Sequence, residues 1–397
     1  MSVTYPAGFI AAGVTAGFKP SGLPDLGLLV GDPGTAAAGV FTTNRVSAAP
    51  VRLSRARLAL GAPRAVVVNS GQANAATGAQ GDADAETTTA AAAAALGLDA
   101  AEMLQCSTGV IGEPLHLPQL DAALPTLVGA LSPEGGEDFA RAIMTTDTVD
   151  KRATAESDGI RVGGCAKGVG MIAPNLATML VFVTTDAAVA APDLQRIVQE
   201  QLKPRFNALT VDASTSTNDT VLLFASGAAG APPAAPGSLA WVRLAESVAS
   251  VGESLLRQLA TDAEGATHVL IVEVEGADAQ EDARVIAKAV ADSPLVKTAA
   301  FGGDPNPGRI LQAAGAAGVA FDPASLDVWI GDVRLAEGGV IPPAYFGGDQ
   351  LIEEARGQMH AAEISIRVKV GEGHGKSRAM GCDLSYDYVR INGEYTT

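Results

Sequence analysis

A glycine-rich segment near the middle of the chain brings together residue types that could carry out nucleophilic chemistry. It runs from Gly163 to Phe182 and contains Pro174-Asn175-Leu176-Ala177-Thr178. A Pro-Asn pair favours a turn, and the apolar residues 179–183 predict a strand directly after it. A threonine therefore stands at the entrance of a predicted buried strand. Its hydroxyl is a poor nucleophile unless a base activates it.

Thr178 would acquire a base of its own if the Ala177–Thr178 bond were cut. The α-amine of a terminal threonine has an ordinary pKa of about 7.7–8.0, so it is partly neutral near physiological pH. An internal threonine can create this state by itself. Its hydroxyl attacks the preceding carbonyl, the acyl group shifts from nitrogen to oxygen, and water hydrolyses the ester. From spacing alone, however, an ordinary β-branched strand residue is the favoured interpretation of Thr178.

Other sequence patterns associated with catalysis are absent or weak. Lys167 precedes a glycine and is followed by no hydroxyl, so the segment does not match the GxxxxGK[ST] phosphate loop. The four histidines show no metal-ligand spacing, and no GxSxG motif occurs. Ser107-Thr108-Gly109 is by itself an ordinary turn. We therefore expect no metal site.

Strand-like stretches alternate with alanine-rich helical ones along the chain, which predicts a mixed α/β architecture. The predicted strands are 65–68, 179–183, 269–274 and 364–370. The predicted helices are 87–98, 194–202 and 239–259, the first with Asp82, Asp84 and Glu86 at or before its start. Residues 226–237 read as a loop.

The composition narrows the classes of partner. Hydrophobic residues make up 47% of the 397, and the net charge is −17, which argues against a nucleic-acid partner. No strongly apolar run reaches the length of about 18 residues that a membrane helix needs, and the start has no signal-peptide pattern. We expect a cytoplasmic protein. Three widely spaced cysteines cannot form a complete disulfide framework.

The stretch Lys167 to Leu180, KGVGMIAPNLATML, resembles the self-processing region of the ornithine acetyltransferases, also called glutamate N-acetyltransferases. Other segments resemble that family in order along the chain: 38–45, 69–78, 107–112, 144–148, 215–220, 262–267 and 381–397. The similarity extends from near residue 10 to the last residue. It implies an α/β fold of the ornithine acetyltransferase, N-terminal-nucleophile-like kind, with layered sheets and helices and two fragments made from one precursor.

The resemblance also implies an activity. Family members cleave before the residue that matches Thr178, which here would give fragments 1–177 and 178–397 that stay together. The freed Thr178 would take acetyl from N-acetylornithine and pass it to glutamate in a ping-pong cycle of arginine biosynthesis or of a secondary pathway. No metal or organic cofactor is implied, and two copies of each fragment would assemble. Whether acetyl-CoA is also a donor stays open.

Individual site residues follow from the same resemblance. Thr108 and Gly109 match the pair that stabilises the oxyanion. The residues that match substrate contacts are Thr145 or Thr146, Lys167, Thr178, Glu264, Asn392 and Thr397. Lys167 suits a substrate carboxylate, and Glu264 suits an ammonium.

Three departures from the family place the choice of acceptor in question. Pro307 and Met380 stand where tryptophan is usual, and Ala213-Ser214 replaces a Gly-Asp pair. Two other functions remain as alternatives. One is an N-terminal-nucleophile amidase or aminopeptidase, in which water takes the acyl group. The other is an unprocessed, non-catalytic binding protein that would remain a single chain.

Overall fold

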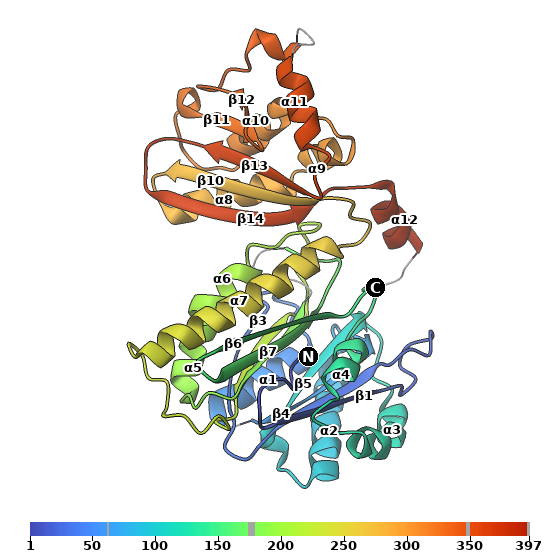
Figure 1. Ribbon diagram of the computed structural model, residues 1–397. Coiled ribbons are helices and arrows are strands. Elements are labelled where there is room, and N and C mark those ends of the chain that lie inside the picture. Colours follow the sequence, from blue (N-terminus) through green and yellow to red (C-terminus); the bar gives the residue numbers. More distant parts are fainter. Residues whose placement is uncertain (62, 174–178, 347–349, 395–397) are drawn as a thin grey trace. The chain divides into compact units, whose positions relative to one another are not determined.

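The computed structural model describes residues 1–397 except 62, 174–178, 347–349 and 395–397. The chain divides into two compact units (Figure 1). Unit 1 contains residues 1–207 and 214–259, and unit 2 contains 208–213 and 260–394. The predicted cleavage point, Ala177–Thr178, lies outside the described residues.

Unit 1 is built on two β-sheets. Its strands are β1 (Phe9–Val14), β2 (Leu26–Gly31), β3 (Ala36–Phe41), β4 (Ala65–Gln72), β5 (Met103–Val110), β6 (Lys151–Ser157), β7 (Ile160–Lys167), β8 (Leu180–Thr185) and β9 (Thr220–Ala225). One sheet has the order β1-β2-β4-β5, and the other has the order β3-β9-β8-β7-β6. The β4–β5 and β8–β9 pairs are parallel, and the remaining pairs are antiparallel.

Helices accompany both sheets of unit 1. They are α1 (Ala49–Leu60), α2 (Gly78–Leu96), α3 (Leu117–Gly129), α4 (Gly136–Ala142), α5 (Ala191–Ile197), the π-helical turn Val198–Leu202, α6 (Lys203–Phe206) and α7 (Leu239–Thr261). Apolar side chains of both sheets and of α4 share one core, in which the rings of Phe139 and Phe182 meet edge to face at 5.1 Å. A second core lies between the first sheet and helices α2 and α3. These layers agree with the predicted arrangement of layered sheets and helices.

Unit 2 contains one mixed sheet and five α-helices among its described residues. The strands are β10 (Val269–Ala277), β11 (Asp327–Ile330), β12 (Val333–Ala336), β13 (Glu363–Lys369) and β14 (Gly375–Cys382). The helices are α8 (Gln280–Asp292), α9 (Pro294–Phe301), α10 (Pro307–Gly315), α11 (Gln350–Gln358) and α12 (Tyr386–Glu394). The sheet order is β12-β11-β13-β10-β14. Alternate residues of β10 and β13 pack with α8 and α10 in one apolar core, as the period of two in a half-buried strand requires.

Most predicted elements are present. The strand predictions at 65–68, 179–183, 269–274 and 364–370 fall on β4, β8, β10 and β13, and residues 226–237 hold no helix or strand. One prediction is wrong at its boundary: the helix predicted over 87–98 begins at Gly78, so Asp82, Asp84 and Glu86 lie inside α2. The three cysteines are buried, and none of them forms a disulfide. In the described part of the chain, no helix is both long enough and apolar enough to span a bilayer.

Candidate active site

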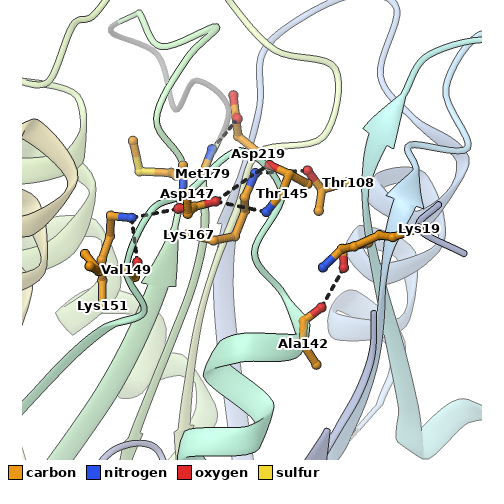
Figure 2. Close-up of polar contacts among 12 residues, drawn as sticks. Lys19, Thr108, Ala142, Thr145, Asp147, Val149, Lys151, Lys167, Met179 and Asp219 are labelled. Atoms are coloured by element: carbon orange, nitrogen blue, oxygen red, sulfur yellow. Dashed lines mark hydrogen bonds and ion pairs between the residues drawn. The ribbon is translucent and has the colours of Figure 1, made fainter. Parts of the chain in front are cut away.

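Lys167 is the centre of a buried polar cluster in unit 1. It ends β7, where it pairs with Leu180 of β8, and only 2% of it is exposed. Its Nζ donates hydrogen bonds to the hydroxyls of Thr145, at 2.8 Å, and Thr108, at 3.2 Å (Figure 2). The three residues come from segments far apart in the sequence, so the fold brings them together. Thr146, the other predicted contact at this position, is the next residue and is partly buried.

Asp147 fixes the geometry around that lysine. Its carboxylate accepts from Lys151 Nζ at 2.7 Å, from the Gly168 amide at 2.8 Å and from the Thr145 amide at 3.0 Å. The Lys167 ammonium lies 4.0 Å away. Burial alone would raise the pKa of Asp147, but the ammonium groups of Lys167 and Lys151 outweigh burial and hold that pKa below its ordinary value. Asp147 therefore stays ionised and holds the turn that carries Thr145.

Thr108 and Gly109 lie near the end of β5, where the backbone requires glycine at position 109. Gly109 has a φ of +126°, and a Cβ added there would lie 2.2 Å from the carbonyl oxygen of Gly71. Gly71 is its parallel partner in β4. Because Thr108 accepts a hydrogen bond from Lys167, its own O–H proton is available to another acceptor. The turn expected at residues 107–109 is thus part of strand β5. A hydroxyl and a neighbouring backbone N–H near the end of one strand still suit a developing oxyanion.

Met179, the first described residue after position 178, is held by two hydrogen bonds of its backbone. The Met179 amide donates to Asp219 Oδ1 at 2.9 Å, and the Met179 carbonyl accepts from the Thr220 amide at 3.1 Å. Asp219 is fully buried, and burial raises its pKa well above the ordinary value. Its second oxygen, Oδ2, has no hydrogen-bond partner among the described residues. Ala177 and Thr178 themselves lie outside the described residues.

Glu264 and Asn392 form a second polar pair, in unit 2. Asn392 lies on α12 and donates its amide to Glu264 Oε2 at 2.9 Å. Four residues earlier on the same helix, the hydroxyl of Tyr388 donates to Asp212 at 3.2 Å. Burial and then the charge of Asp212 raise the pKa of Tyr388. The predicted contact at Thr397 lies outside the described residues.

Of the positions that depart from the family, Ala213, Pro307 and Met380 lie in unit 2 and Ser214 lies in unit 1. Pro307 occupies the first turn of α10, where a missing N–H is tolerated. Met380 is fully buried in β14, and its backbone pairs with Ala208 and Thr210. Ala213 adopts a φ of +58°, a conformation that glycine would take at lower cost.

Sequence reasoning assigned no role to three charged residues of unit 1. Asp147 and Asp219 stand inside segments used for the resemblance, and a carboxylate directly before the apolar strand β9 is a signal for Asp219. Lys19 lies in a loop near the start of the chain, and nothing in its sequence surroundings connects it with Thr108 or Lys167.

Comparisons with known proteins identify the family. The ArgJ family matches residues 10–397. The chain belongs to the ArgJ family. Among curated relatives, the arginine biosynthesis bifunctional protein ArgJ of Thermosynechococcus vestitus is 46% identical and covers 100% of this chain and 98% of its own. The protein of the same name from Thermus thermophilus is also 46% identical, with 100% of both chains covered.

A solved structure of the family agrees with the fold. The crystal structure of arginine biosynthesis bifunctional protein ArgJ from Bacillus halodurans matches with a TM-score of 0.51 and 38% identity. The match covers 98% of that crystallised chain but only 54% of this one. The predicted fold class, that of the ornithine acetyltransferases, is therefore confirmed.

Proposed function

We propose that this ArgJ-family chain is a self-cleaving glutamate N-acetyltransferase of arginine biosynthesis that moves acetyl from N-acetylornithine to glutamate. Membership of the family along residues 10–397 supports the acetyl-transfer role and does not favour the amidase or binding-protein alternatives. The observation that carries the chemistry is the buried Lys167 ammonium, which contacts the hydroxyls of Thr108 and Thr145. In this proposal the two substrates are N-acetylornithine and glutamate, and the protein acts in the cytoplasm.

Self-cleavage would divide the chain into residues 1–177 and 178–397. The Thr178 hydroxyl attacks the Ala177 carbonyl, the acyl group moves from nitrogen to oxygen, and water hydrolyses the ester. The length of the crystallised Bacillus halodurans chain supports this proposal. Nearly all of it matches 54% of the present chain, which is close to the share that residues 178–397 make up. We further propose an assembly of two copies of each fragment.

Acetyl transfer then proceeds in two half-reactions. The Thr178 α-amine takes the hydroxyl proton while Oγ1 attacks the acetyl carbonyl of N-acetylornithine. The oxyanion accepts hydrogen bonds from the Thr108 hydroxyl and the Gly109 N–H. The C–N bond breaks and ornithine leaves with the proton on its amine, which leaves an acetyl ester on Thr178. The amine of glutamate attacks that ester, N-acetylglutamate departs, and the threonine is restored.

Intact mass spectrometry of the denatured protein tests the first step. The wild type is expected to give two fragments that meet at Ala177–Thr178, and a Thr178→Ala variant is expected to give one chain. After incubation with N-acetylornithine, the fragment 178–397 should gain the mass of one acetyl group, and added glutamate should remove it as N-acetylglutamate. A single wild-type chain would contradict self-cleavage, and release of free acetate at the same rate with and without glutamate would favour the amidase.

A further inference from the structure

Lys19 is held in a defined position by a buried carboxylate. The loop after β1 wraps around Asp25, which is fully buried and accepts the backbone N–H groups of residues 16–19 at 2.6 to 3.1 Å. The last of these four donors is the amide of Lys19 itself, at 2.9 Å. Four hydrogen bonds to one carboxylate fix a loop that would otherwise be mobile. The Lys19 side chain therefore projects from a rigid base.

This loop lies against the part of β4 that pairs with the proposed oxyanion residues of β5. The carbonyl oxygen of Phe18 accepts the side-chain amide of Gln72 at 3.0 Å. It also lies so near to Gly71 that an added Cβ would meet it at 2.8 Å. Gly71 is the β4 partner of Gly109 in β5. In Figure 2 the Lys19 side chain is drawn on one side of the cluster of Thr108, Thr145 and Lys167, and its amine is at the end on the side of that cluster.

The Lys19 ammonium lacks a carboxylate partner. It donates to the backbone carbonyl of Pro24 at 2.7 Å, and no carboxylate of the described residues lies within ion-pair distance. An ammonium has three donors, so two remain. Burial lowers the pKa of Lys19 from 10.5 to about 8; Asp25 and Asp147 oppose this shift, and Lys167 adds to it. The charges of Lys167 and Asp147 are thus close enough to be felt at Lys19.

Lys19 is a partly buried cation near this polar cluster, and its ammonium has no carboxylate within ion-pair distance in the described part of the chain. A partly buried cation without a counter-charge is costly, and a single bound carboxylate would remove that cost.

We propose that the Lys19 ammonium, together with that of Lys167, binds the α-carboxylate that N-acetylornithine and glutamate share. This rests on the proposed function. The side-chain ends of the two substrates carry opposite charges, an ammonium in one and a carboxylate in the other. A fixed ammonium placed at that end would repel the donor, so it serves both substrates only at the carboxylate they have in common.

A comparison of two acetyl donors isolates the contact between Lys19 and the α-carboxylate. N-acetylornithine carries the α-carboxylate, whereas N-acetylputrescine has the same acetamide and terminal amine without it. The rate of acetyl-enzyme formation, kcat/KM for the first half-reaction, would be measured by mass for both donors. The variants are Lys19→Met and Lys19→Arg, with Lys376→Met as the matched control, because the Lys376 side chain is 72% exposed. Thermal melting and fragment masses of each variant show whether it folds and cleaves.

Lys19→Met is expected to lower kcat/KM for N-acetylornithine by about 10- to 100-fold, the usual effect of one hydrogen bond to a charged group. It should leave N-acetylputrescine unchanged, Lys19→Arg should restore most of the loss, and Lys376→Met should match the wild type. If Lys19 only clamps its loop through Pro24, both donors will slow equally, which would overturn the proposal.

The pH dependence of the preference for N-acetylornithine over N-acetylputrescine provides a second test of the proposal. Groups that act on both donors, including the Thr178 α-amine, cancel in the ratio of the two kcat/KM values. Since the pKa of Lys19 is lowered to about 8, the preference for N-acetylornithine should decline in the wild type as the pH rises through 8. The decline should be absent in Lys19→Arg. A wild type that forms no acetyl-enzyme would contradict the proposed function itself, whereas a wild type that reacts while Lys19→Met behaves like the control would contradict this inference alone.

Discussion

At the scale of single residues, the site depends on which group donates each hydrogen bond. Lys167 has donors only, so Thr108 and Thr145 must act as acceptors toward it. This leaves the hydroxyl proton of Thr108 directed elsewhere, and the positive charge behind its oxygen makes that proton a stronger donor. The role proposed for Thr108 thus depends on a lysine that lies on another strand.

Removing that hydroxyl should slow acetyl transfer without preventing folding. Thr108→Val keeps the β-branched shape, and we expect it to lower kcat by about 100- to 1000-fold, the usual effect of losing one oxyanion donor. Steady-state transfer from N-acetylornithine to glutamate measures this effect. Thr108→Ser, which retains a hydroxyl, should remain within about tenfold of the wild type. A Thr108→Val enzyme of normal rate would exclude Thr108 from the oxyanion site.

Asp147 should stabilise the fold in a pH-dependent manner. Because its folded pKa is lowered, its contribution is complete above the unfolded pKa of about 3.9 and is lost as the pH falls through the folded pKa. At pH 7, Asp147→Asn should reduce the free energy of unfolding by about 3–5 kcal/mol, since it removes the buried negative charge that faces the ammonium groups of Lys151 and Lys167. The difference from the parent should shrink in strong acid.

Denaturant unfolding in a Thr178→Ala background measures this, because an uncut chain unfolds as one molecule. Asp158→Asn is the control, since the Asp158 side chain is 64% exposed. An equal loss of stability in both variants, or a difference that does not depend on pH, would contradict the role given to Asp147.

At the scale of elements, the end of β5 is shaped by its parallel neighbour. The positive φ of Gly109 and the closeness of the Gly71 carbonyl leave no room for a side chain. Gly112, three residues later, also has a positive φ, of +87°, but has open space around its Cβ position. The two glycines therefore separate the effect of crowding from that of backbone conformation.

Gly109→Ala should destabilise the protein by about 2–5 kcal/mol, from backbone strain together with displacement of β4. Gly112→Ala has only the strain, about 1–2 kcal/mol, and should retain its activity. Thermal melting and transfer assays of the two variants test this. Equal melting temperatures would mean that β4 yields easily at Gly71.

The same elements show what the sequence could and could not predict. The strands at β4, β8, β10 and β13 follow from runs of apolar residues. The sequence predicts the start of α2 too late, because Asp82, Asp84 and Glu86 resemble the acidic residues at a helix N-terminus, whereas they lie inside α2. A Cβ on Gly81 would lie 1.9 Å from Thr77 Oγ1 and 2.4 Å from Asn74 Oδ1, so the close approach of side chains that precede the helix explains that glycine inside it.

The residues of the site also divide into those that the sequence predicts and those that only the folded chain shows. The grouping of Thr108, Thr145 and Lys167 agrees with the resemblance, because their motifs can be recognised from sequence. Lys19 could not be found in that way: the hydrogen bonds that fix it and the strand that connects it with Gly109 exist only in the folded chain. The burial that raises the pKa of Asp219 is equally invisible in a list of residues.

At the scale of the whole molecule, the proposed cut separates neighbours in one sheet. β7 precedes residue 178 and β8 follows it, yet the two strands pair along their length from Val162↔Thr185 to Lys167↔Leu180. Both also contribute side chains to the core that the two sheets of unit 1 share. Scission would therefore remove one covalent bond and leave the hydrogen bonds between β7 and β8, and their packing in the core, intact.

The fragments should accordingly migrate together under native conditions and separate only in denaturant. In size-exclusion chromatography, both should elute in one peak. The unfolding midpoint should rise more steeply with protein concentration for the cut protein than for Thr178→Ala, because each cut copy unfolds into two chains and each uncut copy into one. Separate elution of the fragments in native buffer would contradict the pairing of β7 with β8 after cleavage.

The position of β8 between β7 and β9 also bears on how such a protein can be made. If the two halves were produced as independent chains, the first would present β7 as an open strand edge and the second would present β8. Each would also expose apolar side chains that the other normally covers. Bare edges of this kind invite pairing with the wrong chain and aggregation. A single polypeptide keeps the two edges at high local concentration until they have paired. The uncut chain thus keeps β7 and β8 connected while the protein folds. Once the two strands have paired, that covalent connection is no longer needed.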